Sequence, residues 1–324
     1  MSNFWPKVKK PIFVVAPMAN VTDAVFRKLI AKYGKPEVMW TEFVSADGLV
    51  SEGRENLLVD LKFSKAERPI VAQLFTGHPE AMKKAAKLVG KLGFDGLDIN
   101  MGCPDRSVEK QGGGASLIRN PKNAVAVIHA AREGLNDAGK NIPVSVKTRI
   151  GYNKVDMEWL STLLKEKLPV LTVHLRTRKE MSDVPAHWEL MPEILKLRDE
   201  ISPETLIIGN GDAVSLEDGA AKLKKYGGDG VMIGRGIFGT PWLFDRSVNN
   251  KSAEKTPDER LKIMVEHAKS FEKTFKGIKN FAIMRKHFKA YVSSWEGAKE
   301  LRVKLMETEN SAQVKKVVDE YLAS

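Results

Sequence analysis

Eight short apolar runs recur along the first 235 residues, and each has the length of a single buried strand. Between most of them, apolar residues repeat at helical spacing, as they do over residues 81–92. Strands that alternate with helices indicate a parallel sheet covered by helices. The predicted strands are residues 12–16, 38–43, 70–75, 96–100, 144–148, 170–175, 206–209 and 230–233, and the other predicted helices are 123–132, 157–165, 189–197 and 215–226.

Eight strand-and-helix units within about 240 residues favour an α/β fold of the (β/α)8 TIM-barrel type. An open doubly wound sheet is the alternative that the same pattern allows. In a barrel the active site lies at the carboxyl ends of the strands. The residues that end the predicted strands are therefore the first candidates for function.

The pattern changes after residue 245. Residues 245–255 are polar and predict a linker, and the sequence Thr-Pro-Asp-Glu at 256–259 has the spacing of a capping box with proline at the first helical position. Apolar residues then recur at helical spacing towards the end of the chain. We therefore expect a TIM-barrel catalytic domain over residues 1–249 and a small all-α helical bundle over residues 250–324.

The chain carries a formal net charge of +11, from 52 Lys and Arg against 41 Asp and Glu. Such a surplus favours a polyanionic partner such as RNA or DNA, although a basic protein without such a partner has the same charge. No apolar run approaches the length of about 20 residues that spans a membrane, and the first residues do not resemble a signal peptide. We therefore expect a cytoplasmic protein.

The single cysteine of the chain, Cys103, lies directly after the fourth predicted strand, in the segment Asn-Met-Gly-Cys-Pro at residues 100–104. One cysteine excludes an internal disulfide and a cysteine-based zinc cluster, and we expect no metal site. A thiol at the carboxyl end of a barrel strand lies where ligands bind. An inert buried cysteine is the alternative.

Two glycine-containing turns follow the seventh and eighth predicted strands, at residues 210–212 and 234–236. Barrels often build phosphate sites at this place, because glycine allows close approach of the backbone and Arg235 can pair with phosphate oxygens. Ordinary turns are the alternative. Residues 234–239 also match the pattern GxGxxG, but no further strand follows, so we reject a dinucleotide-binding domain.

Taken together and in this order, the strand-end motifs resemble those of the tRNA-dihydrouridine synthases, flavin enzymes that reduce uridine in tRNA. The segment around Cys103 continues with Val108, Gly114, Leu117 and Pro121, at the spacing of the family's signature. The similarity covers most of residues 12–245, and its other motifs are residues 16–19, 21–23, 26–27, 72–74, 147–149, 174–178, 210–212 and 234–236.

The resemblance implies an FMN cofactor in the barrel and NADPH as a transient reductant. A cation at Lys147 stabilises reduced flavin, and Gln73 can exchange hydrogen bonds with the same ring. Many members of the family carry glycine where this chain has Leu175, which adds bulk beside His174. The residues implied to line the FMN site are Pro17, Met18, Ala19, Gln73, Lys147, His174, Asn210, Gly211, Asp212, Gly234 and Arg235.

Reduction of uracil at its 5,6 double bond needs a hydride at C6, supplied by reduced flavin, and a proton at C5. A thiol with an ordinary pKa of about 8.5 is mostly protonated at neutral pH, so Cys103 suits the general acid, and the resemblance places the proton donor at this position. Asn100 can hold the edge of the uracil. The uridine must be flipped out of the tRNA, and the basic residues expected to contact the RNA are Arg176, Arg178, Arg285, Lys286 and Lys289.

Two other functions stay open from the sequence. A flavin barrel that acts on a free pyrimidine, as dihydroorotate and dihydropyrimidine dehydrogenases do, shares the barrel and the FMN site but leaves the basic charge and the helical bundle unexplained. A barrel that binds tRNA without catalysis is the other, and the presence of Cys103, Lys147 and His174 argues against it.

Overall fold

The computed structural model of the protein describes residues 3–247 and 254–323. The chain forms two compact units. The barrel unit comprises residues 1–24 and 36–234, and the helical unit comprises residues 25–35 and 235–324. The domain boundary expected between residues 249 and 250 lies outside the described residues.

The barrel unit contains one sheet of eight parallel strands, in the order β1-β8-β7-β6-β5-β4-β3-β2. Each predicted strand overlaps an observed strand and differs from it by at most two residues at either end. This confirms the TIM-barrel prediction. The strands are β1 (Ile12–Val15), β2 (Met39–Ser45), β3 (Ile70–Phe75), β4 (Gly96–Met101), β5 (Val144–Arg149), β6 (Val170–His174), β7 (Leu206–Asn210) and β8 (Gly230–Ile233).

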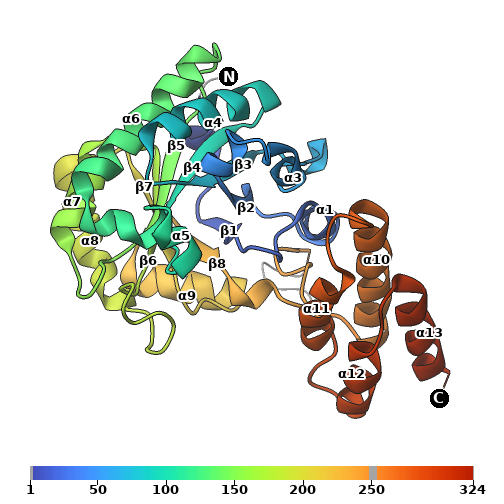
Figure 1. The fold of residues 1–324 in the computed structure, drawn as a ribbon. Helices are drawn as coiled ribbons and strands as arrows, with labels where there is room; N and C mark the ends of the chain where they lie inside the picture. The colour runs from blue at the N-terminus through green and yellow to red at the C-terminus, as the bar shows by residue number, and fades with distance from the viewer. Residues whose placement is uncertain (1–2, 248–253, 324) are drawn as a thin grey trace. The chain divides into compact units, whose positions relative to one another are not determined.

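Helices surround the strands of the barrel unit (Figure 1). The longest, α6 (Pro121–Asp137), begins with Asn120, whose side chain accepts a hydrogen bond from the Asn123 N–H, and it has proline at its first position. The other helices are η1 (Trp5–Lys7), α2 (Ala46–Leu49), α3 (Arg54–Leu58), η2 (Lys65–Glu67), α4 (Pro79–Leu92), α5 (Arg106–Lys110), η3 (Gly114–Arg119), α7 (Met157–Lys165), η4 (Trp188–Leu190), α8 (Met191–Ile201) and α9 (Leu216–Tyr226).

The two end strands of the sheet, β1 and β2, meet just before β2 begins. The Glu37 N–H donates to the Phe13 carbonyl at 3.3 Å, and the Phe13 N–H donates to the Glu37 carboxylate at 2.9 Å. One apolar cluster of the barrel unit includes Ile12, Val71 and Met232 from three strands, together with Trp5 from the N-terminal segment.

A group of polar side chains lies on the strands β3, β4 and β5. Register pairing places Gln73 beside Asp98, Asp98 beside Ser145, and Asn100 beside Lys147. Residues two apart on a strand share a face, so these side chains extend in one direction from the sheet. They form a polar layer towards the carboxyl ends of strands whose other residues are largely apolar.

The helical unit contains a helix that the sequence did not predict. This helix, α1, lies between β1 and β2 in the chain, but residues 25–35 belong to the helical unit. Its Lys32 Nζ lies 2.7 Å from Glu266, and its Tyr33 hydroxyl donates to the same carboxylate at 2.5 Å. The elements of the unit are α1 (Ala24–Tyr33), η5 (Arg235–Ile237), α10 (Pro257–Phe275), η6 (Phe281–Ile283), α11 (Met284–Tyr291), α12 (Ala298–Met306) and α13 (Ser311–Leu322).

The start of α10 confirms the capping box predicted from the sequence. The Thr256 side chain accepts a hydrogen bond from the Glu259 N–H, while the Glu259 carboxylate accepts one from the Thr256 N–H. The buried face of α10 includes Met264, His267 and Phe271. This face contacts α1 and α11, and α12 and α13 also bury apolar residues, so the core of the unit draws on all five helices.

Candidate active site

The turn that carries Cys103 follows β4, and four hydrogen bonds hold its backbone groups. The Asn100 Oδ1 accepts from the N–H groups of Gly102 at 3.1 Å and Cys103 at 2.9 Å. The Gly102 carbonyl accepts from the Arg149 Nε at 2.8 Å, and the Cys103 carbonyl accepts from the Ala115 N–H at 2.9 Å. Every backbone donor and acceptor of residues 102 and 103 thus has a partner, and the thiol projects from a fixed turn.

Gly114 allows the chain to close against this turn. Its φ is +59°, in the left-handed region that favours glycine. A Cβ at this position would lie 2.6 Å from the Cys103 carbonyl oxygen and 2.7 Å from a methyl group of Val108. The glycine of the signature segment is therefore required by close packing on the cysteine turn.

Burial raises the pKa of the Cys103 thiol above its ordinary value. The Asp105 N–H, Lys147 and Arg149 oppose this shift, but the desolvation effect is larger. The thiol is partly exposed, so it can still reach a ligand. A raised pKa keeps the thiol protonated at neutral pH, as a general acid requires.

A chain of buried side chains leads from the barrel interior to the cysteine turn. The Asp98 carboxylate accepts from the Gln73 Nε2 at 2.6 Å and from the Ser145 hydroxyl at 2.5 Å. The Gln73 Oε1 accepts from the Asn100 Nδ2 at 3.1 Å. Burial raises the pKa of Asp98 to about 6, against the effects of Ser145, Gln73 and Lys147.

Asp98 was not predicted as a site residue. The available signal was its charge inside an apolar strand, two residues before Asn100 and therefore on the same face. A carboxylate that is 1% exposed needs partners, because an isolated buried charge is costly. The two hydrogen bonds to Asp98 meet that need.

Lys147 extends from β5 on the same face and has no comparable partners. Its ammonium makes no hydrogen bond and no close ion pair with any residue that the structure describes. Burial, together with the nearby Arg149, lowers the pKa of Lys147 to about 8, so the side chain is still mostly protonated at neutral pH. An enclosed cation with free donors is suited to an anionic or hydrogen-bond-accepting ligand.

His174 ends strand β6, Arg176 lies two residues after it, and the two side chains contact each other. The Arg176 guanidinium lies 3.3 Å from the His174 Nε2, 2.5 Å from the Asp212 carboxylate and 2.5 Å from the Val184 carbonyl. The Arg176 side chain is only 3% exposed. It therefore ties the loop after β6 to the turn after β7, and its predicted contact with RNA stays a prediction.

The turn after β7 is closely packed on the same group. Gly211 has a φ of +130°, and a Cβ there would lie 2.6 Å from the Ala186 Cβ and 3.3 Å from the His174 ring. The Trp188 Nε1 donates to the Gly211 carbonyl at 2.8 Å. The Asn210 Nδ2 donates to a carbonyl of β8, so this side chain points across to the neighbouring strand.

The remaining predicted cofactor residues lie at the ends of β1 and β8. Pro17 is buried, Met18 is half-buried and Ala19 is exposed directly after β1. Gly234 follows β8 with partial exposure, and Arg235 is exposed at the start of η5. The assignment of these five residues to a cofactor site stays a prediction.

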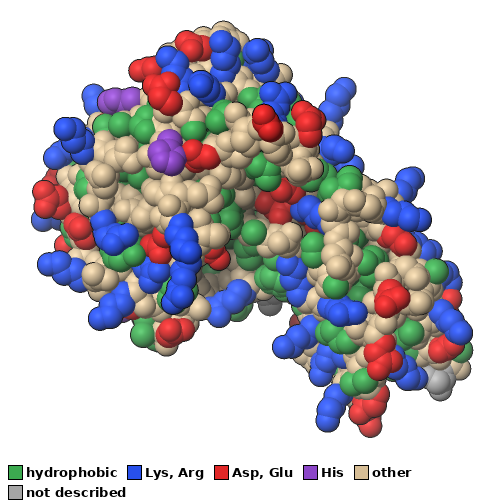
Figure 2. Space-filling model, in the orientation of Figure 1, with side chains coloured by type: hydrophobic (Ala, Val, Ile, Leu, Met, Phe, Trp, Pro, Cys, Tyr) green, Lys and Arg blue, Asp and Glu red, His purple; other side chains and the backbone are tan. Residues whose placement is uncertain are grey.

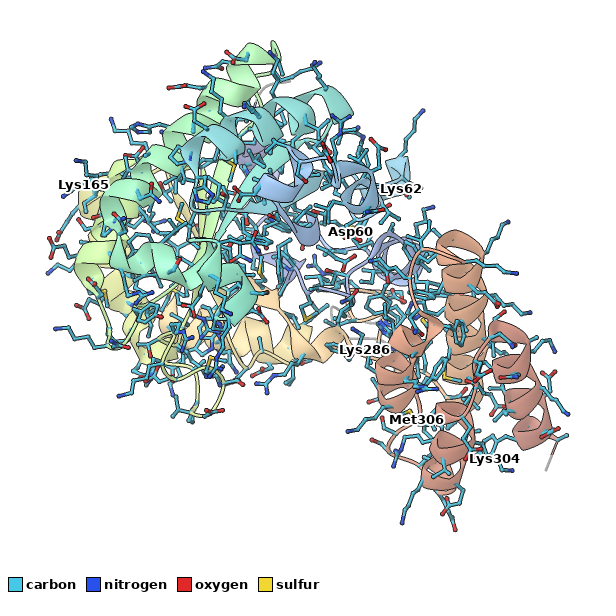
Figure 3. All side chains as sticks on the ribbon, viewed as in Figure 1. Asp60, Lys62, Lys165, Lys286, Lys304 and Met306 are labelled. Carbon is cyan, nitrogen blue, oxygen red and sulfur yellow. The ribbon has the colours of Figure 1, made fainter. Side chains whose placement is uncertain are left out.

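The predicted RNA contacts fall in two separate groups. Arg178 belongs to the barrel unit, where its guanidinium pairs with Glu109 at 2.5 Å and lies over the Tyr152 ring. Arg285 and Lys289 are exposed on α11, and Lys286, labelled in Figure 3, is half-buried on the same helix. Lys and Arg side chains are scattered over the visible face of the helical unit, among Asp and Glu side chains and hydrophobic residues (Figure 2). Their contact with RNA stays a prediction.

The described residues contain no group of three or more His, Cys, Asp or Glu side chains that could hold a metal ion. Within those residues, no helix has the length and apolar character needed to cross a membrane.

The chain is similar to known proteins at the level of a family model, of individual sequences and of solved structures. The family model described as dihydrouridine synthase matches residues 14–324. The "Probable tRNA-dihydrouridine synthase 2" of Bacillus subtilis (strain 168) is 41% identical over 98% of this chain and 96% of its own length. The "Probable tRNA-dihydrouridine synthase" of Staphylococcus aureus (strain COL) is 41% identical over 99% of this chain and 96% of its own length.

Solved structures share the fold at low sequence identity. Morphinone reductase matches with a TM-score of 0.53 and 13% identity, over 77% of this chain and 88% of its own. A 2-naphthoyl-CoA reductase complex matches with a TM-score of 0.56 and 11% identity, over 76% of this chain and 54% of its own. These likenesses concern the barrel fold alone.

Proposed function

We propose that this chain, which belongs to the dihydrouridine synthase family, reduces uridine to 5,6-dihydrouridine in tRNA. Its membership rests on a family model that matches nearly the whole chain and on relatives that are 41% identical over almost their full lengths. The observation that carries the chemistry is the placement of a protonated thiol on a fixed turn, with an unpartnered lysine ammonium on the adjacent strand.

The residues present fit an FMN cofactor. Lys147 offers free donors to a ring that becomes anionic on reduction, and Gln73 retains one N–H beyond the one that it gives to Asp98. When bound, reduced FMN supplies the hydride for uracil C6, and NADPH is the proposed source of its electrons. The other residues that we propose to hold FMN are Pro17, Met18, Ala19, His174, Asn210, Gly211, Asp212, Gly234 and Arg235.

Cys103 supplies the proton for uracil C5 in this proposal. Its raised pKa keeps a proton on the Sγ, and the four hydrogen bonds of its turn restrict where the Sγ can lie. General acids placed in this way contribute about 10²–10⁴-fold to a rate. The Asn100 Oδ1 accepts hydrogen bonds from the turn, and one N–H of its Nδ2 donates to Gln73. The second N–H of the Nδ2 is therefore left for the uracil edge.

We propose that the basic residues of α11 hold the tRNA. A uridine inside folded tRNA reaches an enclosed site only when it is flipped out, which costs a few kcal/mol, and phosphate contacts offset that cost. Arg285 and Lys289 are exposed and can make such contacts. Because its proposed substrate is tRNA, we propose that the protein acts in the cytoplasm.

The purified protein tests this proposal directly. We expect a flavin absorption spectrum, release of FMN on denaturation, and NADPH-dependent formation of dihydrouridine in unmodified tRNA, measured by mass spectrometry of nucleosides. Free uridine under the same conditions is the control, and it should not be reduced. Reduction of free uridine in place of tRNA would favour an enzyme of free pyrimidines, and binding of tRNA by a colourless protein would contradict the proposal.

A further inference from the structure

We infer that Asp98 is a positioning residue that sets the orientation of the cysteine turn through the side-chain amides of Gln73 and Asn100. The three side chains are 0–6% exposed, so water cannot substitute for their mutual hydrogen bonds. The inference deepens the proposed function, because it rests on Cys103 as the proton donor whose position matters.

The first link is between Asp98 and Gln73. Both carboxylate oxygens of Asp98 accept hydrogen bonds, one from the Gln73 Nε2 and one from the Ser145 hydroxyl. An ionised carboxylate has no donor, so only the NH2 end of the Gln73 side chain can face it. The Gln73 backbone is fixed as well, because its N–H donates to the Thr41 hydroxyl at 3.1 Å.

The second link passes this orientation to the turn. Because the NH2 end of Gln73 faces Asp98, its carbonyl faces Asn100 and accepts from the Asn100 Nδ2. The Asn100 carbonyl must then point the other way, where it accepts from the N–H groups of Gly102 and Cys103. A single carboxylate thus determines the direction of two amides and the acceptor for the turn.

An amide in place of the carboxylate removes this directionality. Asparagine at position 98 can present either its oxygen or its NH2 group to Gln73, so Gln73 can turn over. A reversed Gln73 brings its NH2 group to that of Asn100, and a reversed Asn100 leaves the two N–H groups of the turn facing a donor. We expect the cysteine turn to loosen while the barrel around it stays folded.

The single cysteine of the chain provides a direct measurement of this loosening. The rate of alkylation by iodoacetamide at fixed pH reports on Cys103 alone, in the purified protein with its bound cofactor and without tRNA. We expect Asp98→Asn to be alkylated about three- to tenfold faster than the wild type, at an unchanged melting temperature. Ser145→Ala is the matched control, because it removes the other hydrogen bond to the same carboxylate and leaves the amide chain intact; its rate should be close to wild type.

A double-mutant cycle separates positioning from general destabilisation. If Asp98 acts through Asn100, the variant with both Asp98→Asn and Asn100→Ala is alkylated at the same rate as Asn100→Ala alone. Additive effects, or a wild-type rate in Asp98→Asn, would overturn the inference. If Asp98→Asn does not fold, Gln73→Met breaks the same chain at its second member and should give the same acceleration, whereas a wild-type rate there would overturn the inference.

Kinetics with tRNA add a test that distinguishes this inference from the proposed function. In Asp98→Asn we expect kcat for dihydrouridine formation to fall about tenfold, because the proton donor and the Asn100 amide both move. The affinity for tRNA, measured by filter binding, should stay close to that of the wild type, because the basic residues of α11 are unchanged. A wild-type protein that forms no dihydrouridine would contradict the proposed function, while faster alkylation of Asp98→Asn would still support the positioning of the turn. An active wild type would support the proposed function, and an unchanged alkylation rate in Asp98→Asn would at the same time contradict the positioning of the turn by Asp98.

Discussion

The two units of the protein bury polar side chains in opposite ways. In the barrel unit, Asp98, Gln73 and Asn100 form an unbroken series of hydrogen bonds. In the helical unit, His267 and His287 are fully buried, yet the His267 Nε2 and both ring nitrogens of His287 have no hydrogen-bond partner among the described residues. The hydrogen bonds of the barrel unit fix the orientation of the side-chain amides, whereas the histidine rings of the helical unit fill space in its core.

The two histidines behave as aromatic side chains. The His267 ring stacks on Phe26 at 5.1 Å and meets the His287 ring edge-on at 4.6 Å, while the Tyr291 hydroxyl lies 3.4 Å from the His267 Nδ1. Burial lowers the pKa of His287 to about 3 and holds the pKa of His267 well below its usual value. Both rings are therefore neutral at physiological pH, and their flat shape is what the core uses.

The largest expected effect comes from removing the Cys103 thiol, whose turn is held by the hydrogen bonds of Asp98, Gln73 and Asn100. We expect Cys103→Ala to reduce dihydrouridine formation by about 10²–10⁴-fold, because the general acid is lost. FMN binding and NADPH oxidation without tRNA should remain, since the cofactor residues are unchanged. Nucleoside mass spectrometry and NADPH consumption measure the two quantities. Wild-type turnover in this variant would exclude Cys103 from the chemistry.

The histidine pair predicts an acid-sensitive helical unit. The pKa of His287 is about 6.5 in the unfolded chain and about 3 in the folded protein. As the pH drops below 6.5, the unfolded chain binds a proton that the folded protein does not, so the folded protein loses stability. At pH 5 this amounts to about 2 kcal/mol. We therefore expect His287→Phe to be more stable than the wild type at pH 5 by about that amount, and by less at pH 7.5.

Urea unfolding followed by circular dichroism at pH 5 and pH 7.5 measures this difference. An equal loss of stability between the two pH values in His287→Phe and the wild type would show that the buried ring does not resist protonation.

Substitutions on the outer face of α11 should have a smaller effect, which is confined to RNA binding. Alanine at Arg285, Lys286 and Lys289 should weaken tRNA binding and flatten its salt dependence, because each lost phosphate contact lowers the slope of log K against log salt by about 0.7–0.9. NADPH oxidation without tRNA should be unchanged. The matched control replaces Lys196, Lys224 and Lys225, which are exposed on α8 and α9, and removes the same charge.

Filter binding of tRNA at several salt concentrations compares the two triple variants. Equal loss of affinity in both would mean that α11 acts only through net charge. Unchanged affinity and slope in the α11 variant would place the RNA contacts elsewhere on the protein.

The smallest expected effect is a shift in the pH at which the alkylation rate of Cys103 reaches its midpoint. Because burial raises the pKa of the Cys103 thiol, the alkylation rate should rise with pH around a midpoint above that of a free cysteine. A series of iodoacetamide rates on the wild type from neutral to alkaline pH measures that midpoint. A midpoint below the free-cysteine value would indicate an activated nucleophile in place of an acid.

Local patterns were sufficient to predict the barrel and the family. Each strand is an apolar run within a few residues, and the motifs at the strand ends are contiguous, so the eight strands and the family resemblance are both confirmed. The motifs of Cys103 and Lys147 fall at the ends of the fourth and fifth predicted strands, which are adjacent in a parallel barrel sheet. In the structure β4 pairs with β5, and Asn100 lies beside Lys147.

Contacts between distant residues could not be predicted in this way. Arg176 and Arg178 were expected to face RNA, yet their partners Asp212 and Glu109 lie 36 and 69 residues away in the chain. The same applies to α1, whose sequence is apolar enough for an outer barrel helix. Its contact with Glu266, more than 230 residues later, assigns it to the other unit.

The assignment of α1 to the helical unit has a consequence for synthesis of the protein on the ribosome. Phe26 leaves the ribosome 241 residues before His267, the ring on which it stacks. At about 5–20 residues per second, its partner follows only after roughly 10–50 seconds. During that interval the strands β2 to β8 of the barrel unit emerge, while the apolar face of α1 has none of its final neighbours from α10 and α11. The helical unit is therefore begun early in translation and completed near its end.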